Sequence, residues 1–192
     1  MAKKENTETK IIETGEVLIQ ERGVNGFSFA DIANIVGIRK ASIHYYFPTK
    51  IDLVKSVLEH YIKHFFTSLD DRCCNLRSLE EVLTAYTEQF KNSLQKNYQV
   101  CLCSMLSMES FSLNNELRQE INTFFNKNVL WLQKKLEEFH IPEEQASTMA
   151  NHLFVVIQGA QLITQNLRDI SYFDSVASKE INSICSWIAD TP

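Results

Sequence analysis

Apolar residues recur every three or four positions along almost the whole chain, a spacing that places them on one face of an α-helix. In the first part of the chain, glycines and one proline divide this pattern into four stretches. The helices predicted there span residues 7–22, 28–36, 39–47 and 49–71. The pattern continues beyond them and predicts five further helices, over residues 78–96, 98–112, 114–139, 142–168 and 173–189.

Residues typical of helix ends mark several of these boundaries. Ser28 and Asp31 form a capping-box pattern, in which each side chain bonds to the backbone of the other residue. Thr49 and Asp52 repeat that spacing at the fourth helix. Gly37 follows the second helix, where a left-handed backbone costs glycine least. These signals predict short helices joined by tight turns.

The composition supports an all-α fold of about nine helices. The 192 residues include only 5 Gly and 3 Pro, whereas the tight turns of a β-sandwich or barrel use both residue types. A hydrophobic fraction of 44% excludes wholesale disorder. This length fits one medium domain, or a small domain fused to a larger one.

Targeting and cysteine signals favour a cytoplasmic protein. The N-terminus is polar and charged, unlike a signal peptide, and no apolar run approaches the about 20 residues of a membrane span. The five cysteines are odd in number and match no zinc-binding spacing, so we expect free thiols in a reducing compartment.

Charge is distributed unevenly. The net charge of −5 by itself argues against nucleic acid. Residues 1–55, however, hold eight Lys and Arg against seven Asp and Glu, a balance of +1, which leaves −6 for the rest. Between Asp31 and Asp52 every charged residue is basic. We therefore expect a near-neutral region with a local basic strip, followed by an acidic body.

The two short helices joined at Gly37 form a helix-turn-helix pattern. Arg and Lys on the second helix can donate to guanine edges or phosphates, alanine can contact a thymine methyl, and Tyr or His can donate to phosphates. The same pattern also fits a helical hairpin with a solvated basic face. The candidate DNA-binding residues are Ser28, Arg39, Lys40, Ala41, Ser42, His44, Tyr45 and Lys50.

The stretch from Gly26 to Leu53 resembles the DNA-binding domain of TetR/AcrR family transcriptional regulators. The resemblance is carried by Asp31-Ile32-Ala33, Gly37, the aromatic cluster at 44–47, and Lys50 with Leu53. Three positions depart from the family pattern: Arg39 replaces a capping Ser or Thr, His44 replaces Tyr, and Ala41 replaces Gly. The resemblance implies a helix-turn-helix domain over residues 7–55 and an effector-binding and dimerisation domain over residues 56–192.

By this resemblance, the protein is a homodimer that binds a palindromic operator, mostly to repress, and a small-molecule effector releases it. Release would move the two recognition helices away from a spacing of one DNA turn. The last two long helices would pair with their copies, although the same residues also suit an intramolecular core. The candidate dimer residues are Phe154, Ile157, Gly159, Ala160, Ile181, Ile184 and Ile188.

Aromatic side chains after residue 60 are candidates for an effector pocket, and each also suits a helical core. Few charges accompany them, which favours an apolar or neutral effector. The candidate pocket residues are Tyr61, Phe65, Tyr86, Phe90, Cys101, Phe111, Phe125 and Trp131.

Cys101 has a second possible role. The stretch Val100-Cys101-Leu102 with Glu109 is similar to a TetR branch in which some members sense electrophiles or oxidants through this cysteine. A cysteine near a helix N-terminus has a lowered pKa; the alternative is a small buried apolar residue. A regulator switched by thiol oxidation or by a partner protein is thus an alternative to one released by a reversible ligand.

Other functions have weaker support. His60 and His64 are one helical turn apart, but no third metal ligand accompanies them, so we expect no metal and no cofactor. No catalytic motif is present, and a cysteine enzyme would have only Cys101 with His64 or His140. A helical interaction module that does not bind DNA is the remaining alternative.

Overall fold

The computed structural model describes residues 2–109 and 113–190, and the regular elements in these ranges are all helical. This confirms the predicted all-α fold, with nine α-helices and one 3₁₀ turn in the described residues. The elements are α1 (Ala2–Arg22), η1 (Val24–Gly26), α2 (Phe29–Val36), α3 (Lys40–Tyr46), α4 (Lys50–Cys73), α5 (Leu79–Gln95), α6 (Leu102–Met108), α7 (Asn115–Glu138), α8 (Glu143–Leu167) and α9 (Ile170–Asp190).

The predicted capping residues form the starts of α2 and α4. The Oδ2 atom of Asp31 accepts hydrogen bonds from the backbone N and the Oγ of Ser28, both at 2.7 Å. These bonds, the side-chain one above all, lower the pKa of Asp31. At α4, the Oδ2 of Asp52 accepts from the Thr49 backbone N at 2.9 Å, and the Thr49 Oγ1 accepts from the Asp52 backbone N at 3.2 Å.

Three helices differ clearly from the prediction in their extent. The helix α1 begins at Ala2, five residues before the predicted start. Within the stretch predicted over 98–112, only α6 is helical among the described residues, because Asn97 and Tyr98 adopt left-handed backbone angles with φ of 65° and 55°. The helix α9 begins three residues earlier than predicted. The Oδ1 of Asp169 accepts from the Ser171 backbone N at 3.0 Å and thereby caps that helix.

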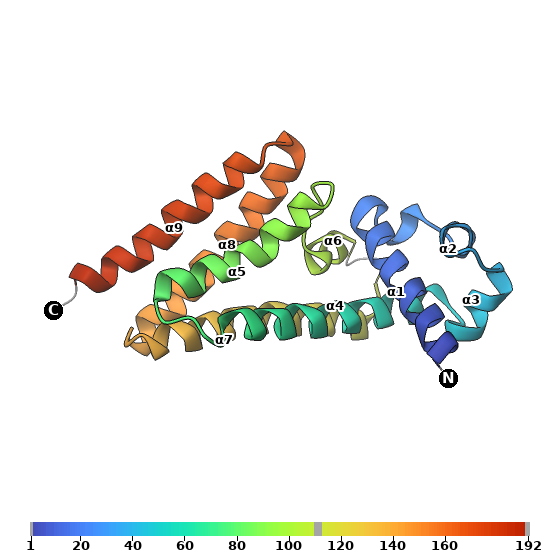
Figure 1. Cartoon of the computed structure of the whole chain (residues 1–192), viewed down its shortest axis with the longest axis horizontal. Helices are drawn as coiled ribbons and strands as arrows, with labels where there is room; N and C mark the ends of the chain where they lie inside the picture. The colour runs from blue at the N-terminus through green and yellow to red at the C-terminus, as the bar shows by residue number, and fades with distance from the viewer. Residues whose placement is uncertain (1, 110–112, 191–192) are drawn as a thin grey trace. The chain divides into compact units, whose positions relative to one another are not determined.

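The helix-turn-helix belongs to a first compact unit, whose described residues are 2–64, 102–109 and 113–121. In this unit α1 packs against α2 and α6, and α2 packs against α3 (Figure 1). Its core contains side chains without solvent exposure, among them Ile11, Ile32, Ile43 and Leu53. The unit therefore joins the predicted DNA-binding segment to residues 102–121, which the resemblance places in the second domain.

The second compact unit comprises residues 65–101 and, among the described residues, 122–190. The helices α5, α8 and α9 lie side by side in it (Figure 1). Aromatic rings fill its centre: the Phe65 ring lies 5.3 Å from that of Phe90 and 5.1 Å from that of Phe124, between ring centroids. Such aromatic clusters contribute both buried area and favourable edge-to-face contacts.

The described residues contain neither a membrane-spanning helix nor a cluster of metal-ligating side chains. None of the described helices is both long enough and apolar enough to cross a membrane. His60 and His64 are neighbours on α4, with ring centroids 4.2 Å apart. Within the described residues, no group of three or more His, Cys, Asp or Glu side chains is arranged to hold a metal ion.

Candidate DNA-binding interface

The turn between α2 and α3 depends on Gly37. This residue has φ 75° and ψ 35°, and its backbone N donates to the Ala33 carbonyl at 3.0 Å. The backbone N of Ile38 donates to the same carbonyl, also at 3.0 Å. A left-handed glycine that closes the helix in this way is a common C-terminal cap. It directs the chain into α3, where Ile43 is fully buried and holds the helix to the domain.

The outer face of α3 is polar and cationic. Arg39, at the N-cap, and Lys40 are exposed, and neither makes an ion pair with the residues that the structure describes. Ala41 is exposed beside them, and Ser42 is half-buried. Tyr45 is 70% exposed, although it is a large aromatic residue. A helix that presents unpaired cations, a hydroxyl and a methyl group to solvent matches the donors that read a DNA groove.

His44 is also exposed, but contacts with Phe29 and Pro48 fix the orientation of its ring. Its ring packs edge-on against Phe29, with 4.9 Å between the ring centroids, and its Nδ1 lies 3.3 Å from the Pro48 carbonyl oxygen. Because a carbonyl oxygen only accepts, Nδ1 carries the proton in this bond. A neutral ring then leaves Nε2 as an acceptor, and only the protonated ring donates from Nε2 to a phosphate.

Two other candidate DNA contacts have partners within the chain. The Lys50 ammonium donates to the Phe27 carbonyl and lies over the Phe27 ring, 4.2 Å from its centroid. Burial lowers the pKa of Lys50, although the nearby carboxylates of Glu109 and Asp31 oppose that shift. Ser28 is exposed but donates to Asp31 through its hydroxyl. Both residues therefore support the start of α2 in this structure.

Glu109, which follows α6, supports the chain ahead of the helix-turn-helix. Its Oε1 accepts from the Val24 backbone N at 2.8 Å, and its Oε2 accepts from Asn25 Nδ2 at 2.9 Å. Gly23 adjoins the carboxylate with φ 70°, and a Cβ at this position would lie 1.9 Å from Oε1. The sequence analysis singled out Glu109 but missed its contact with Gly23, because no local pattern relates positions so far apart.

The candidate pocket residues are placed mainly in the core of the second unit. Tyr86 and Phe90 are almost fully buried, and the Tyr86 ring stacks on Trp131 at 5.7 Å between centroids. Phe65 is buried in the same cluster, and Phe125 is half-buried against Phe154. The structure thus brings most of this set together as packed rings. Tyr61 belongs to the first unit and is half-buried, and Phe111 lies outside the described residues.

Cys101 has no solvent exposure, and its backbone N donates to the Gln161 Oε1 at 2.9 Å. The Gln161 side chain also donates to the Phe90 carbonyl at 2.9 Å, so it joins the segment that precedes α6 to α5. A thiol at this position packs as a small apolar group in the structure.

Most of the candidate dimer residues are buried within the single chain. Gly159 is exposed on α8, and the side chain of Ile188 lies outside the described residues. The other five are buried: Phe154, Ile157, Ala160, Ile181 and Ile184. Large apolar residues on α8 that are exposed in one chain, and that sequence reasoning missed, are Val155, Leu162, Ile163 and Leu167.

Family models match both parts of the chain. Residues 11–57 match the model described as bacterial regulatory proteins of the tetR family. Residues 76–179, more than half of the chain, match the C-terminal domain of LmrA/YxaF-like transcriptional regulators.

Individual proteins show the same likeness. An uncharacterised HTH-type transcriptional regulator from the lacX 3′ region of Lactococcus lactis is 26% identical, over 88% of this chain and 89% of its own. IcaR of Staphylococcus epidermidis, a negative transcriptional regulator of the biofilm operon icaADBC, is 27% identical over 63% of this chain and 66% of its own. The crystal structure of a TetR transcriptional regulator from Legionella pneumophila is 28% identical and superposes with a TM-score of 0.82, covering 91% of this chain and 95% of its own.

These relatives are DNA-binding regulators rather than enzymes, and α3 presents the exposed basic face that such regulators need. The family models together cover the helix-turn-helix and most of the second unit. The chain therefore belongs to the TetR family of bacterial transcriptional regulators, with a C-terminal domain of the LmrA/YxaF-like type.

Proposed function

We propose that this regulator is a cytoplasmic repressor that binds a palindromic operator as a homodimer and leaves it when the second unit takes up an effector. The observation that carries the proposal is the pair of exposed, unpaired cations at the start of α3, Arg39 and Lys40. Repression is supported by the likeness to IcaR, which is named a negative transcriptional regulator.

In the operator complex, α3 lies in the major groove. Arg39 and Lys40 donate to bases or phosphates, and Ala41 and Ser42 lie on the same exposed end of the helix. Tyr45 donates its hydroxyl to a phosphate. Lys50 and Ser28 act indirectly, because their side chains already hold the backbone that leads into α2.

The dimer proposal rests on the exposed apolar face of α8. Val155, Gly159 and Leu162 are spaced at intervals of four and three residues, so they share one face of the helix. Exposed apolar area that is continuous along a helix favours burial against a partner. A symmetric pairing of α8 and α9 with their copies would bury this face and would place Gly159 at the closest approach.

The dimer is tested by replacing Leu162, which is 48% exposed, with glutamate. We expect L162E to elute as a monomer in size-exclusion chromatography with light scattering, because two like charges would be buried against each other. The matched control is L130E, which makes the same change at a residue that is 62% exposed on α7. A dimeric L162E, or a monomeric L130E, would contradict the assignment of the interface to α8.

DNA binding is tested by a gel shift with the promoter fragment of the protein's own gene. The variant R39A/K40A should lose the shift. The control K127A/K134A removes two exposed lysines from α7 and should bind like the wild type. Retained binding by R39A/K40A would place the contact elsewhere on the molecule.

The burial of Cys101 distinguishes two routes by which the repressor could leave its operator. Cys101 has no exposure, so release by thiol modification would require the segment around it to open first. A reversible effector in the second unit needs no such opening at this residue. The variant C101S separates the two routes: a thiol-switched repressor would lose its response to electrophiles, and a ligand-switched repressor would keep its response to the ligand.

A further inference from the structure

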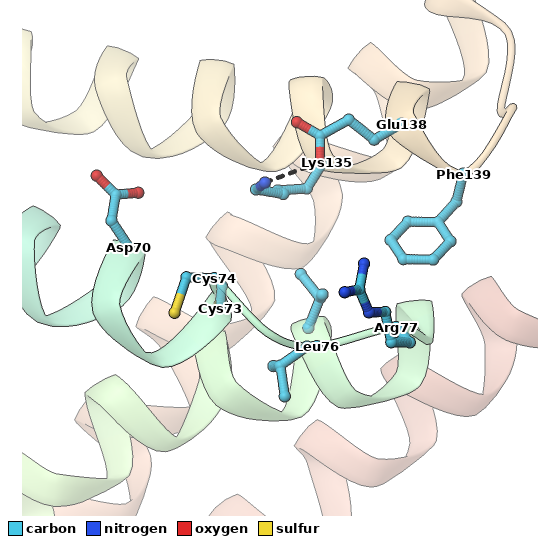
Figure 2. Close-up of a pocket in the computed structure, with 9 residues that line it drawn as sticks. Asp70, Cys73, Cys74, Leu76, Arg77, Lys135, Glu138 and Phe139 are labelled. Atoms are coloured by element: carbon cyan, nitrogen blue, oxygen red, sulfur yellow. Dashed lines mark hydrogen bonds and ion pairs between the residues drawn. The ribbon is translucent and has the colours of Figure 1, made fainter.

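A cavity of about 360 Å³ lies in the second unit, between the end of α4, the start of α5 and the end of α7. Cavities of this size hold small organic ligands in other proteins. It is lined by different residues from the aromatic cluster of the core. The apolar side chains that line it are Leu76, Val82 and Phe139. The other lining residues are charged or carry a thiol, and Figure 2 shows Arg77 between Leu76 and Phe139.

The two carboxylates in this cavity are already engaged. The Asp70 Oδ1 accepts a hydrogen bond from Trp131 Nε1 at 3.0 Å, and the Glu138 Oε2 accepts from the Lys135 ammonium at 2.8 Å. The ion pair with Lys135 therefore offsets the charge of Glu138, whereas Asp70, bonded to a neutral indole, keeps its negative charge.

Two cationic side chains line this cavity, Lys135 and Arg77, and Lys135 is the one paired with an acid. The Arg77 side chain makes no ion pair with any residue that the structure describes. Figure 2 shows its guanidinium extending into the cavity toward Phe139. Its backbone is fixed, because the Arg77 N donates to the Glu81 Oε2 at 3.1 Å and Ser78 shares that carboxylate as part of the cap of α5. A fixed backbone lowers the entropy lost when the guanidinium binds a ligand.

We propose that this cavity binds a small organic carboxylate with a compact apolar body. The carboxylate pairs with the guanidinium of Arg77, whose two parallel N–H donors match its geometry. The apolar body packs against Leu76, Val82 and Phe139. A monoanion is favoured over a phosphate dianion, because one guanidinium balances one negative charge and the Asp70 carboxylate repels a second. This differs from the apolar or neutral effector expected from the sequence.

The inference deepens the proposed function, since the occupant would be the effector, but the site is tested on the full-length protein without DNA. A failure here would leave the gel-shift result with the promoter fragment unaffected. The probes are benzoate, phenylacetate and 4-phenylbutyrate, each paired with its neutral amide, and binding is measured by isothermal titration calorimetry. We expect carboxylates to bind at least about tenfold more tightly than their amides, the loss typical of one charge-assisted hydrogen bond.

The variant R77Q should weaken carboxylate binding by about tenfold or more and leave the amides nearly unchanged. The matched control is R72Q, because Arg72 is also exposed, lies near the end of α4 and does not line this cavity. It should bind like the wild type. Equal binding of acids and amides, absence of binding by all three acids, or full affinity in R77Q would overturn the proposal.

A footprint gives a second measurement that does not depend on a variant. Cys74 is an exposed thiol that lines the cavity, whereas Cys185 lies on α9 outside it. A saturating acid should slow the alkylation of Cys74 by iodoacetamide and leave that of Cys185 unchanged. Unchanged labelling of Cys74 under saturating acid would place the bound ligand elsewhere and would also overturn the proposal.

Discussion

The contact between Glu109 and Gly23 leads to a quantitative prediction about how the helix-turn-helix is held. The Glu109 carboxylate accepts two hydrogen bonds, from the Val24 backbone N and from the Asn25 side chain. A hydrogen bond to a charged group contributes about 1.5–3 kcal/mol when well formed. Because one of these bonds is part-buried and the other exposed, we expect E109A to lower the free energy of unfolding by about 2–3 kcal/mol in total.

A substitution at Gly23 should destabilise the fold more than one at Glu109. The φ of 70° and ψ of 172° at Gly23 lie in a region that residues with a Cβ rarely adopt, at a cost of about 1–3 kcal/mol. The added Cβ would also displace the Glu109 carboxylate, which lies 1.9 Å from its position. The variant G23A should therefore lose both the backbone term and the hydrogen bonds of Glu109, about 4 kcal/mol together.

A double-mutant cycle tests this reasoning by urea unfolding, followed by circular dichroism. Once G23A has displaced the carboxylate, removing Glu109 should cost little more, so G23A/E109A should be nearly as stable as G23A alone. The coupling energy should then be about 2–3 kcal/mol. The milder variant E109Q, which keeps one acceptor, measures the loss of the charge if G23A folds poorly. Additive losses in the cycle would refute the contact as the source of the stabilisation.

Three further predictions follow from local contacts. Hydrogen bonds from Ser28 lower the pKa of Asp31, so the stabilisation that they give is present above the ordinary pKa of an aspartate. This stabilisation is lost as the pH falls through the lower pKa of the folded state. The unfolding midpoints of wild type and S28A should therefore differ at neutral pH and converge in acid, and a pH-independent difference would contradict this. The Tyr86 hydroxyl donates to the buried Asn128 side chain at 3.1 Å, so Y86F should lower the free energy of unfolding by about 1–2 kcal/mol in urea titrations, whereas an unchanged midpoint would show the bond to be unimportant. Because Cys101 has no exposure, its alkylation in the native protein should be at least about 100-fold slower than in urea, and comparable rates would show that its segment opens readily.

The features that could be predicted from the sequence are those fixed by neighbouring residues. The caps at Ser28 and Thr49 and the turn at Gly37 each depend on residues within one helical turn. The spacing of apolar positions indicated the helices because a helical face repeats every 3.6 residues. The basic end of α3 was predictable from the turn, because Gly37 ends α2 and leaves Arg39 and Lys40 at the exposed start of the next short helix.

Long-range contacts and the choice between two apolar faces were not predictable in this way. In α8, Ile157 and Phe154 are buried, but Val155 and Leu162 on another face are exposed. A helix with apolar residues on both faces gives no periodic signal of which one meets the core. Glu109 bonds to Val24 and Asn25, which precede it by 85 and 84 positions, so this contact depends on how the helices pack.

The position of Arg77 in a cavity, between α4 and α5, was also not predictable from the sequence. Arg77 has the same local surroundings as any exposed arginine near a helix start. Its position in a cavity follows from the end of α7, which brings Lys135 and Phe139 to the same place. No pattern within residues 70–82 contains that information.

The central claim is that α3 reads DNA through Arg39 and Lys40, and the salt dependence of binding tests it most directly. Fluorescence anisotropy with the promoter fragment, over a range of salt concentrations, gives the slope of log affinity against log salt. Each neutralised phosphate contributes about 0.9 to that slope, so a dimer of R39A/K40A should lose up to about 3.6 as well as affinity. The control K127A/K134A should keep the wild-type slope. A wild-type slope and affinity in R39A/K40A would contradict the account.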